Sequence, residues 1–240
     1  MIFNDKMHDC DSTWDVWKKL YDVIYRDIFG DIFDFENIKD SETSKRCKRW
    51  YIKIDKVKQP NMAEKYPKFK IAGDCIFNFN EKKIELFSGL IGECEKELLL
   101  TCKNNHHSLL NFSFMPITGG LNNTKGILRC ENGVEKKSFD RPDVLIDELA
   151  KYYNGMPARV FRKTNREALE WYLNLFAGRG IAGYCKDIYL IDNEEMLQRF
   201  LAFAKKPICD SDTAIEYMKL ACDYWGMKKK ILTDFKITEF

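Results

Sequence analysis

Large apolar residues recur at helical spacing near the start of the chain. The segment STWDVWKKLYDVIYRDIF, which begins at Ser12, carries one every three or four positions: Trp14, Trp17, Tyr21, Ile24 and Ile28. This period predicts an amphipathic helix with its apolar face against a core, and Ser12 and Asp15 approximate a capping pair. Gly30 is expected to end the helix, and the charged residues that follow predict a connection with a short helix near 41–50.

A different pattern occupies residues from about 68 to 130. Short β-rich runs are separated there by Gly, Asn and Lys: KFKIAGDCIFNFN, KKIELFS, ELLLTCK, LLNFSFMPI and GILRC. These runs predict an antiparallel sheet of four to five strands. Pro116 cannot donate a hydrogen bond to a neighbouring strand, so its strand is expected at an edge of the sheet or where pairing breaks.

Helical spacing returns near residue 140 and continues to about 232. Asp140 is expected to cap a helix that has Pro142 in its first turn, with Val144, Leu145, Leu149, Tyr152 and Tyr153 on its apolar side. Polar pairs mark the starts of three later helices: Thr164 with Glu167, Asp192 with Glu195, and Thr213 with Glu216. In the last helix, apolar positions 214, 217, 218, 221, 222 and 225 form a broad stripe.

Together these segments predict the fold class and the domain organisation. The chain of 240 residues contains no internal repeat, low-complexity tract or flexible linker. We therefore expect a single α+β domain over residues 1–240, with segregated layers. Its parts are a helical N-terminal region at 1–60, the sheet at 68–130 and a helical region at 140–232.

The charge balance argues against a general affinity for nucleic acid. The chain has 39 basic and 37 acidic side chains, a formal net charge of +2, so no global field attracts a polyanion. A local basic cluster beside an aromatic residue could still contact phosphates and bases: Lys45, Arg46, Lys48 and Arg49 with Trp50. A solvated helix face is the favoured interpretation, and nucleic acid is possible as a partner but not favoured.

The cysteines and the N-terminal sequence indicate a reducing compartment. Nine cysteines are scattered without a C-x-x-C pair, so neither zinc binding nor redox chemistry is indicated and all are expected to be reduced thiols. The start, MIFNDKMHDCDST, lacks the basic and apolar regions of a signal peptide. No run approaches the length of a membrane span, and we expect a cytoplasmic protein with no membrane association.

The segment FSFMPITGGLNNTKG, residues 112–126, is the main candidate for ligand binding. Backbone N–H groups freed by glycine, side-chain amide and hydroxyl groups and one ammonium could form a nest for phosphate or carboxylate. The candidate residues are Thr118, Gly119, Gly120, Asn122, Asn123 and Lys125. The alternative is a solvated hairpin loop, in which Gly and Asn merely permit positive φ.

Other chemistry is weakly indicated. His106 and His107 are expected at a hairpin tip, where one of them could act as a general base, and Asp140 and Arg141 could handle protons or charge. The glycines of GRGIAG, 178–183, match a dinucleotide-binding pattern but follow a helix rather than a strand, so a helix end and a tight connection explain them better. No nucleophile elbow, zinc-protease motif or phosphate-binding P-loop occurs. We predict no cofactor and no metal.

Four segments carry a resemblance to a known family: NFSFMPITGGLNNTKG, DRPDVLIDELAKYY, GYCKDIYLIDNEEML and YMKLACDYWGMKK. With them the chain resembles an uncharacterised family of bacterial proteins, mostly from Firmicutes, that is known by a domain-of-unknown-function label. The resemblance covers roughly the C-terminal two thirds. It implies a bacterial cytosolic protein of about this length and no assigned activity, substrate or catalytic residue.

Two classes of function follow. The first is a binding or interaction module that presents a surface to a protein or to an anionic small ligand. The absence of catalytic signatures favours it, and so do the 17 Phe, 11 Tyr and 5 Trp, which exceed the needs of a plain core. The alternative is an enzyme acting on a phosphate-containing substrate such as a nucleotide or RNA, in a toxin or phage-defence setting. Convergence of the 118–125 segment, His107 and the Asp140–Arg141 corner would favour the enzyme.

Overall fold

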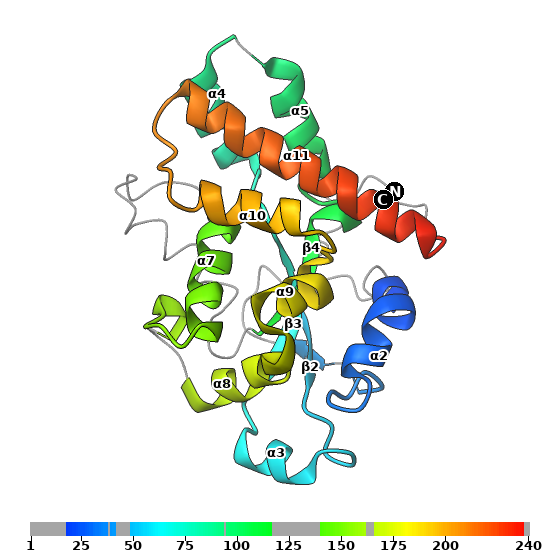
Figure 1. The fold of residues 1–240 in the computed structure, drawn as a ribbon. Helices are drawn as coiled ribbons and strands as arrows, with labels where there is room; N and C mark the ends of the chain where they lie inside the picture. Colours follow the sequence, from blue (N-terminus) through cyan, green and yellow to red (C-terminus); the bar gives the residue numbers. More distant parts are fainter. Residues whose placement is uncertain are drawn as a thin grey trace.

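The computed structural model describes residues 18–37, 39–41, 49–93, 95–116, 140–161 and 166–237. Helices surround a small antiparallel sheet, so the chain mixes helix and strand as an α+β protein does (Figure 1). The long C-terminal helix crosses the molecule beside the sheet. It contacts helices from both the middle and the end of the chain.

Four strands pair in the order β1-β2-β3-β4, all antiparallel. Their bounds are β1 (Lys39–Ser41), β2 (Arg49–Lys53), β3 (Lys70–Cys75) and β4 (Phe112–Pro116). β2, β3 and β4 form a continuous three-stranded sheet. β1 pairs with the first half of β2, around Trp50, whereas β3 pairs with the second half at Ile52 and Lys53. Among the described strands β4 lies at the edge of the sheet, as Pro116 predicts.

The prediction of four to five strands within 68–130 is wrong. KKIELFS lies in helix α4 (Glu81–Ile91) and ELLLTCK lies in helix α5 (Lys96–Asn105). Asn80 caps α4 by accepting a hydrogen bond from the Lys83 backbone N–H at 3.1 Å, and both helices bury apolar residues three or four positions apart. The GILRC run lies outside the described residues. Strands β1 and β2 instead come from the segment predicted to be a connection.

The N-terminal helix is confirmed over its described part. Helical structure runs from position 18 through a π-helical turn, η1 (Tyr21–Tyr25), into α2 (Arg26–Phe29). Gly30 follows as its C-terminal residue. Tyr25 is fully buried, and its hydroxyl donates to the Ile188 carbonyl at 3.0 Å. The helix is thereby tied to the C-terminal part, while the predicted Ser12–Asp15 cap lies outside the described residues.

The described part of residues 140–232 is mainly helical, as predicted. It contains α7 (Pro142–Tyr153), α8 (Arg166–Asn174), α9 (Gly180–Tyr184), α10 (Glu194–Phe203) and α11 (Ser211–Asp234). Three shorter elements lie between these helices: η4 (Arg159–Phe161), η5 (Ala177–Arg179) and the π-helix η6 (Cys185–Tyr189). Two more lie earlier in the chain: α3 (Pro60–Lys65) and η2 (Leu109–Asn111).

Two of the predicted helix starts are displaced. Asn193, not Asp192, caps α10 by accepting from the Met196 N–H at 2.8 Å. Helix α11 begins three residues earlier than predicted, because Thr213 closes a capping box with Asp210 rather than starting one. The Thr164 pair lies outside the described residues.

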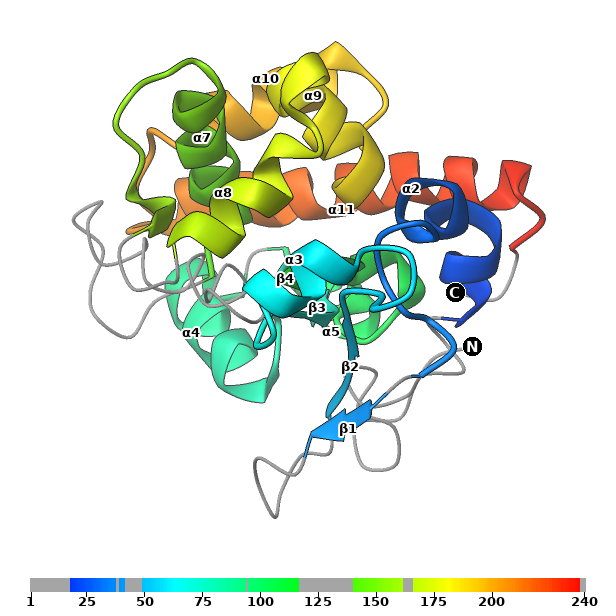
Figure 2. The same cartoon turned by 90° about the horizontal axis from the view of Figure 1, so that it is seen from below.

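Buried residues from most of these elements form one hydrophobic cluster. Helix α11 contacts α4, α5 and α10, and α7, α8, α9 and α10 gather on one side of the strands (Figure 2). Aromatic rings fill much of the cluster; Phe77, for example, packs edge-on against Tyr217 and Trp225. Among the exposed large apolar side chains of the described residues, Phe235 alone is aromatic. The aromatic content therefore serves the core and does not by itself indicate a binding surface.

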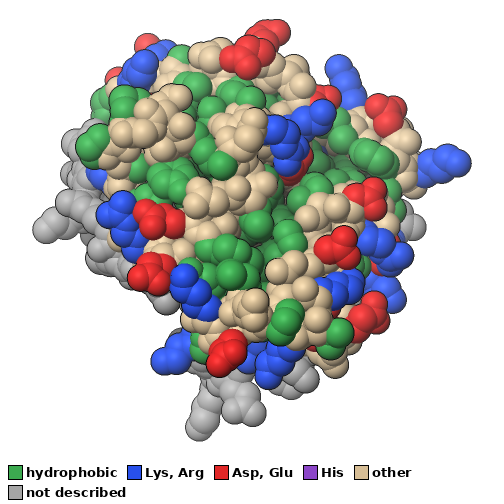
Figure 3. Space-filling model, turned by 60° about the horizontal axis from the view of Figure 1, so that its bottom comes forward, with side chains coloured by type: hydrophobic (Ala, Val, Ile, Leu, Met, Phe, Trp, Pro, Cys, Tyr) green, Lys and Arg blue, Asp and Glu red, His purple; other side chains and the backbone are tan. Residues whose placement is uncertain are grey.

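The outer surface mixes apolar and charged side chains. On the face that carries α3 and α8, apolar side chains form an interrupted band with charged side chains around it (Figure 3). Within the described ranges, the helices lack the combination of length and apolar character needed to cross a membrane.

Candidate functional site

The predicted anion-binding residues 118–125 lie outside the described part of the chain. Strand β4, which leads toward them, is buried along its whole length. The description resumes at Asp140. The ligand-binding role of Thr118, Gly119, Gly120, Asn122, Asn123 and Lys125 therefore stays a prediction.

His106 and His107 lie at the C-terminal end of α5, and the prediction of a hairpin tip is wrong. The run before them forms a helix. The two imidazole rings are neighbours, with centroids 4.2 Å apart. His106 is buried, and its Nδ1 accepts a hydrogen bond from the Phe79 backbone N–H at 3.3 Å. A ring whose Nδ1 accepts carries its proton on Nε2 in the neutral form. His106 thus supports the backbone.

Asn111 is a structural residue that the sequence patterns did not single out. Its Oδ1 accepts from the Phe77 N–H at 3.0 Å and from the Trp225 indole at 3.2 Å. Its Nδ2 donates to the carbonyls of Phe77 and His106. The buried amide uses both of its donors and both of its acceptor positions. The sequence signal for this buried role was a single amide side chain inside the largely apolar run LLNFSF.

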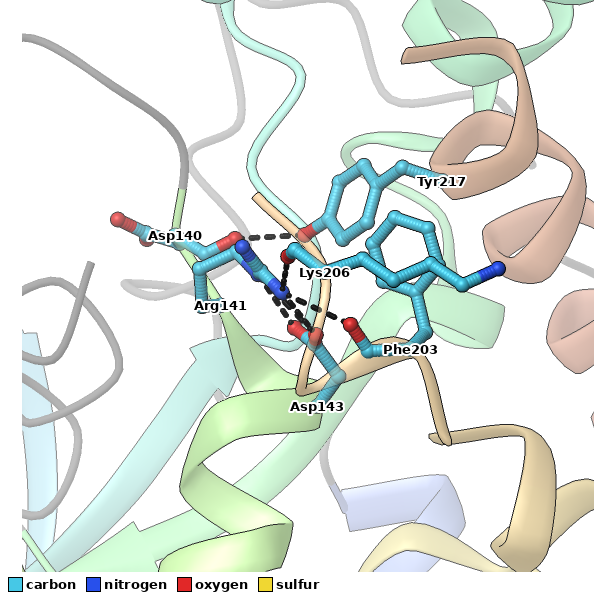
Figure 4. A network of polar contacts seen from close by, with 6 residues as sticks. All are labelled: Asp140, Arg141, Asp143, Phe203, Lys206 and Tyr217. Atoms are coloured by element: carbon cyan, nitrogen blue, oxygen red, sulfur yellow. Dashed lines mark hydrogen bonds and ion pairs between the residues drawn. The ribbon is translucent and has the colours of Figure 1, made fainter. Parts of the chain in front are cut away.

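Asp140 and Arg141 stand at the start of α7, and Arg141 contacts the end of α10 (Figure 4). The Arg141 guanidinium, 1% exposed, forms a bidentate pair with Asp143, with Nη2 2.6 Å from Oδ2. The same Nη2 donates to the carbonyls of Phe203 at 3.2 Å and Lys206 at 2.8 Å. Arg141 therefore joins the start of one helix to the end of another.

Asp140 does not cap α7; Arg141 occupies the N-cap position without a side-chain cap. The Asp140 backbone carbonyl accepts from the Tyr217 hydroxyl at 2.6 Å, and its carboxylate accepts from Asn78 at 3.4 Å. Asn78 precedes Phe79, which contacts His106, so one segment meets two of the proposed catalytic residues. Each side chain is occupied in holding the fold, which does not favour a role in catalysis.

The glycines of GRGIAG lie where one short helix turns into the next. Arg179 ends η5, and Gly180 follows with a φ of 59° as α9 begins. A positive φ of this size favours glycine. Arg179 also pairs with Asp187 of η6. The tight connection predicted for this segment is confirmed.

A groove between α10 and α11 is a site that the motifs did not indicate. It encloses about 630 Å³, within the usual size of ligand clefts. Its walls are the N-terminal part of α10 and the C-terminal half of α11, with these lining residues: Asp192, Asn193, Glu195, Met196, Arg199, Cys222, Asp223, Gly226, Met227, Lys230, Ile231 and Asp234. Arg199 pairs with Asp223 at 2.6 Å and joins the two walls.

The groove carries an excess of negative charge and a few apolar side chains. Four carboxylates line it against two cations, Arg199 and Lys230. One carboxylate, Asp223, is neutralised by Arg199. Met196 is buried and Met227 half-buried, so Met227 offers the larger apolar surface of the two to the groove. Methionine adapts to differently shaped apolar partners.

Gly226 lies in the interior of the 24-residue helix α11 and faces this groove. A Cβ added there would meet nothing within 4 Å. Glycine inside a helix costs about 0.5–1 kcal/mol relative to alanine, and no close neighbour among the described residues requires it. Because Gly226 has no side chain, the backbone of α11 is uncovered at this point of the groove wall.

Lys228 is fully buried one turn beyond the predicted stripe of α11. Its amine donates to the Phe112 carbonyl at the start of β4. No carboxylate in the described ranges pairs with it, and burial lowers the pKa of Lys228 to about 7. Position 228 continues the apolar spacing from Trp225, which is the signal that would have placed it inside.

The arrangement was compared with known proteins. A scan against protein-family models and searches of curated proteins and of solved structures each found no match to this chain. The resemblance to the bacterial family therefore stays a prediction.

Proposed function

We propose that the protein is a binding module that takes a cationic segment of another protein into the groove between α10 and α11. The single observation that carries this proposal is Gly226. A solvent-facing glycine in the middle of a long helix lowers the stability of that helix, and here it leaves open the wall of a groove. Such a position permits a partner's backbone or side chain to approach α11 closely.

The chemistry of the lining supports a cationic occupant. Asp192, Glu195 and Asp234 have no ion pair within the described part of the chain, and they line the groove together with Met196 and Met227. A segment with Lys or Arg beside Leu would place cations on the carboxylates and its apolar side chains against the methionines. The carboxylates would also attract it from a distance, more strongly at low ionic strength.

An enzyme acting on a phosphate-containing substrate has less support. Of the described candidates for its chemistry, His106, Asp140 and Arg141 are engaged in backbone and interhelical hydrogen bonds, whereas His107 lies beside His106. Its predicted phosphate site, 118–125, lies outside the described residues. The groove, with four carboxylates, would repel a phosphate.

The test is a titration of the full chain, labelled with ¹³C at its methionine methyl groups, with a synthetic peptide of alternating Lys and Leu. We expect the Met196 and Met227 resonances to shift, while Met156, which is 50% exposed on the surface outside the groove, stays unchanged. Replacing Gly226 with Leu fills the open wall. This variant should be more stable by about 0.5–1 kcal/mol and bind the peptide about tenfold more weakly.

Gly89→Leu is the matched control, because Gly89 is also exposed within a helix, α4, and a Cβ there also meets nothing within 4 Å. It should gain stability without losing affinity. A peptide with Glu in place of Lys should not bind. The proposal fails if Gly226→Leu binds as tightly as the wild type, if Met156 shifts as much as Met227, or if spermine alone produces the same shifts, which would indicate a small polycation.

A further inference from the structure

Two cysteines from distant parts of the chain meet where α5 packs on α11. Cys102 lies in α5 and Cys222 in α11, 120 positions apart, and their Sγ atoms are 3.9 Å from each other. Cys102 has no exposed surface, whereas Cys222 is half-buried and lines the α10–α11 groove. One sulfur is therefore reachable from solvent and the other lies directly behind it.

We propose that Cys222 is a site of oxidation by hydroperoxides and that Cys102 resolves the oxidised sulfur to a reversible disulfide. Redox-sensing cysteines combine an accessible thiolate with a nearby second thiol, and this pair has both parts. A shift of less than 2 Å brings the sulfurs to the disulfide bond length of about 2.05 Å. The inference does not depend on what the groove binds.

Local interactions favour the thiolate at the accessible position. The hydrogen bond from Cys102 lowers the pKa of Cys222 below its ordinary value, against burial and the charge of Asp223, which both raise it. Burial raises the pKa of Cys102, whose thiol also lies 3.9 Å from the Met218 carbonyl. Cys222 is thus the attacking sulfur, and Cys102 supplies a proton.

The reaction balances in two steps. The Cys222 thiolate attacks the distal oxygen of the hydroperoxide, the O–O bond breaks, and the leaving alkoxide or hydroxide takes up a proton from solvent. Cys222 is thereby oxidised to a sulfenic acid and the peroxide is reduced to an alcohol or water. The Cys102 sulfur then attacks the Cys222 sulfur, the S–O bond breaks, and the hydroxyl leaves as water with the Cys102 proton. A dithiol reductant reverses the product.

The experiment treats the full chain with hydrogen peroxide and then counts thiols after denaturation. We expect the count to fall from nine to seven, because one disulfide consumes two thiols. Peptide mapping without reductant should find residues 102 and 222 linked within a single chain, and a dithiol should restore nine. Cys102→Ser should instead leave a sulfenic acid at Cys222 that dimedone traps.

Cys209 provides the control, because it is exposed and its thiol contacts the Asp210 carboxylate at 3.6 Å rather than a second cysteine. Cys209→Ser should form the 102–222 disulfide as the wild type does, and Cys222→Ser should not form it. The peptide map of the oxidised wild type tests the 102–222 disulfide directly, even if a serine variant folds poorly. Oxidation of Cys209 before Cys222, or a wild-type map without the 102–222 link, would overturn the proposal.

Discussion

Replacing the buried Lys228 with Met removes an amine from the core while keeping a side chain of similar length. The ammonium has no carboxylate partner among the described residues, and its hydrogen-bond acceptor is the Phe112 carbonyl. Burial lowers its pKa from 10.5 to about 7 in the folded state. The unfolded chain keeps the ordinary value, so the two states bind different numbers of protons between these limits.

The sign and size of the effect follow from that difference. Between about pH 7 and 10.5 the unfolded state binds the extra proton, so the free energy of unfolding rises with pH; below about pH 7 both states are protonated and this residue adds no further change. One pKa unit corresponds to about 1.4 kcal/mol, so burial of the amine costs about 4 kcal/mol near pH 7. Losing the hydrogen bond from Lys228 to the Phe112 carbonyl costs about 1–3 kcal/mol. Lys228→Met should therefore be about 1–3 kcal/mol more stable at neutral pH.

Urea unfolding at about pH 7, 8 and 9.5, under reducing conditions, measures both the gain and its pH dependence. Between pH 7 and 9.5 the wild type should gain about 3 kcal/mol of stability relative to the variant and so reach or pass it. The contributions of other titrating groups cancel in the difference between the two proteins. Lys229→Met, at the exposed neighbouring position, should leave the pH profile unchanged. A difference that is constant with pH, or a variant less stable than the wild type at pH 7, would refute the reasoning.

Two further predictions concern the residues that hold the helices. Arg141→Met leaves the Asp143 carboxylate buried without its partner and should lower the free energy of unfolding by about 3–5 kcal/mol, whereas Arg166→Met, at the exposed pair with Glu170, should change it by less than about 1 kcal/mol; equal effects would contradict the assigned role. Asp210→Ala removes the N-cap of α11 and should lower the free energy of unfolding by about 1 kcal/mol. Asp212→Ala, in the first turn of the same helix, should lower it by less. Thermal unfolding of both variants tests this order.

Long amphipathic segments were predictable because their signals are local. The stripe of α11 and the apolar side of α7 follow from period alone, and both helices exist. The polar residue that caps a helix was harder to choose. Asp210 and Asn193 each lie within three positions of the predicted start, and the choice depends on backbone geometry that the letters do not specify.

The sheet was mispredicted where short runs fit two periods. ELLLTCK reads as a strand by composition, but Leu99 and Cys102 are three apart and both are buried in α5. Runs of this length cannot be assigned from periodicity alone. The charged segment around β2 concealed a strand, because pairing with β3 stabilises it through contacts distant in sequence.

The groove and the thiol pair could not be predicted at all. Both depend on how α11 packs against α10 and α5, and no motif encodes that packing. Gly226 reads as a helix-weakening residue, and Cys222 reads as part of an apolar stripe. Their shared exposure to one groove emerges only when the two helices are in place.

Helix α10 is held at both of its ends, and this bears on how fast the groove can bind. Asn193 fixes its first turn, and Arg141 holds the carbonyls of Phe203 and Lys206 at its other end. A wall anchored in this way does not have to rearrange before a partner enters, so little ordering entropy is lost on association. Cationic segments should then associate at similar, salt-sensitive rates, and the tighter ones should differ mainly in how long they stay bound.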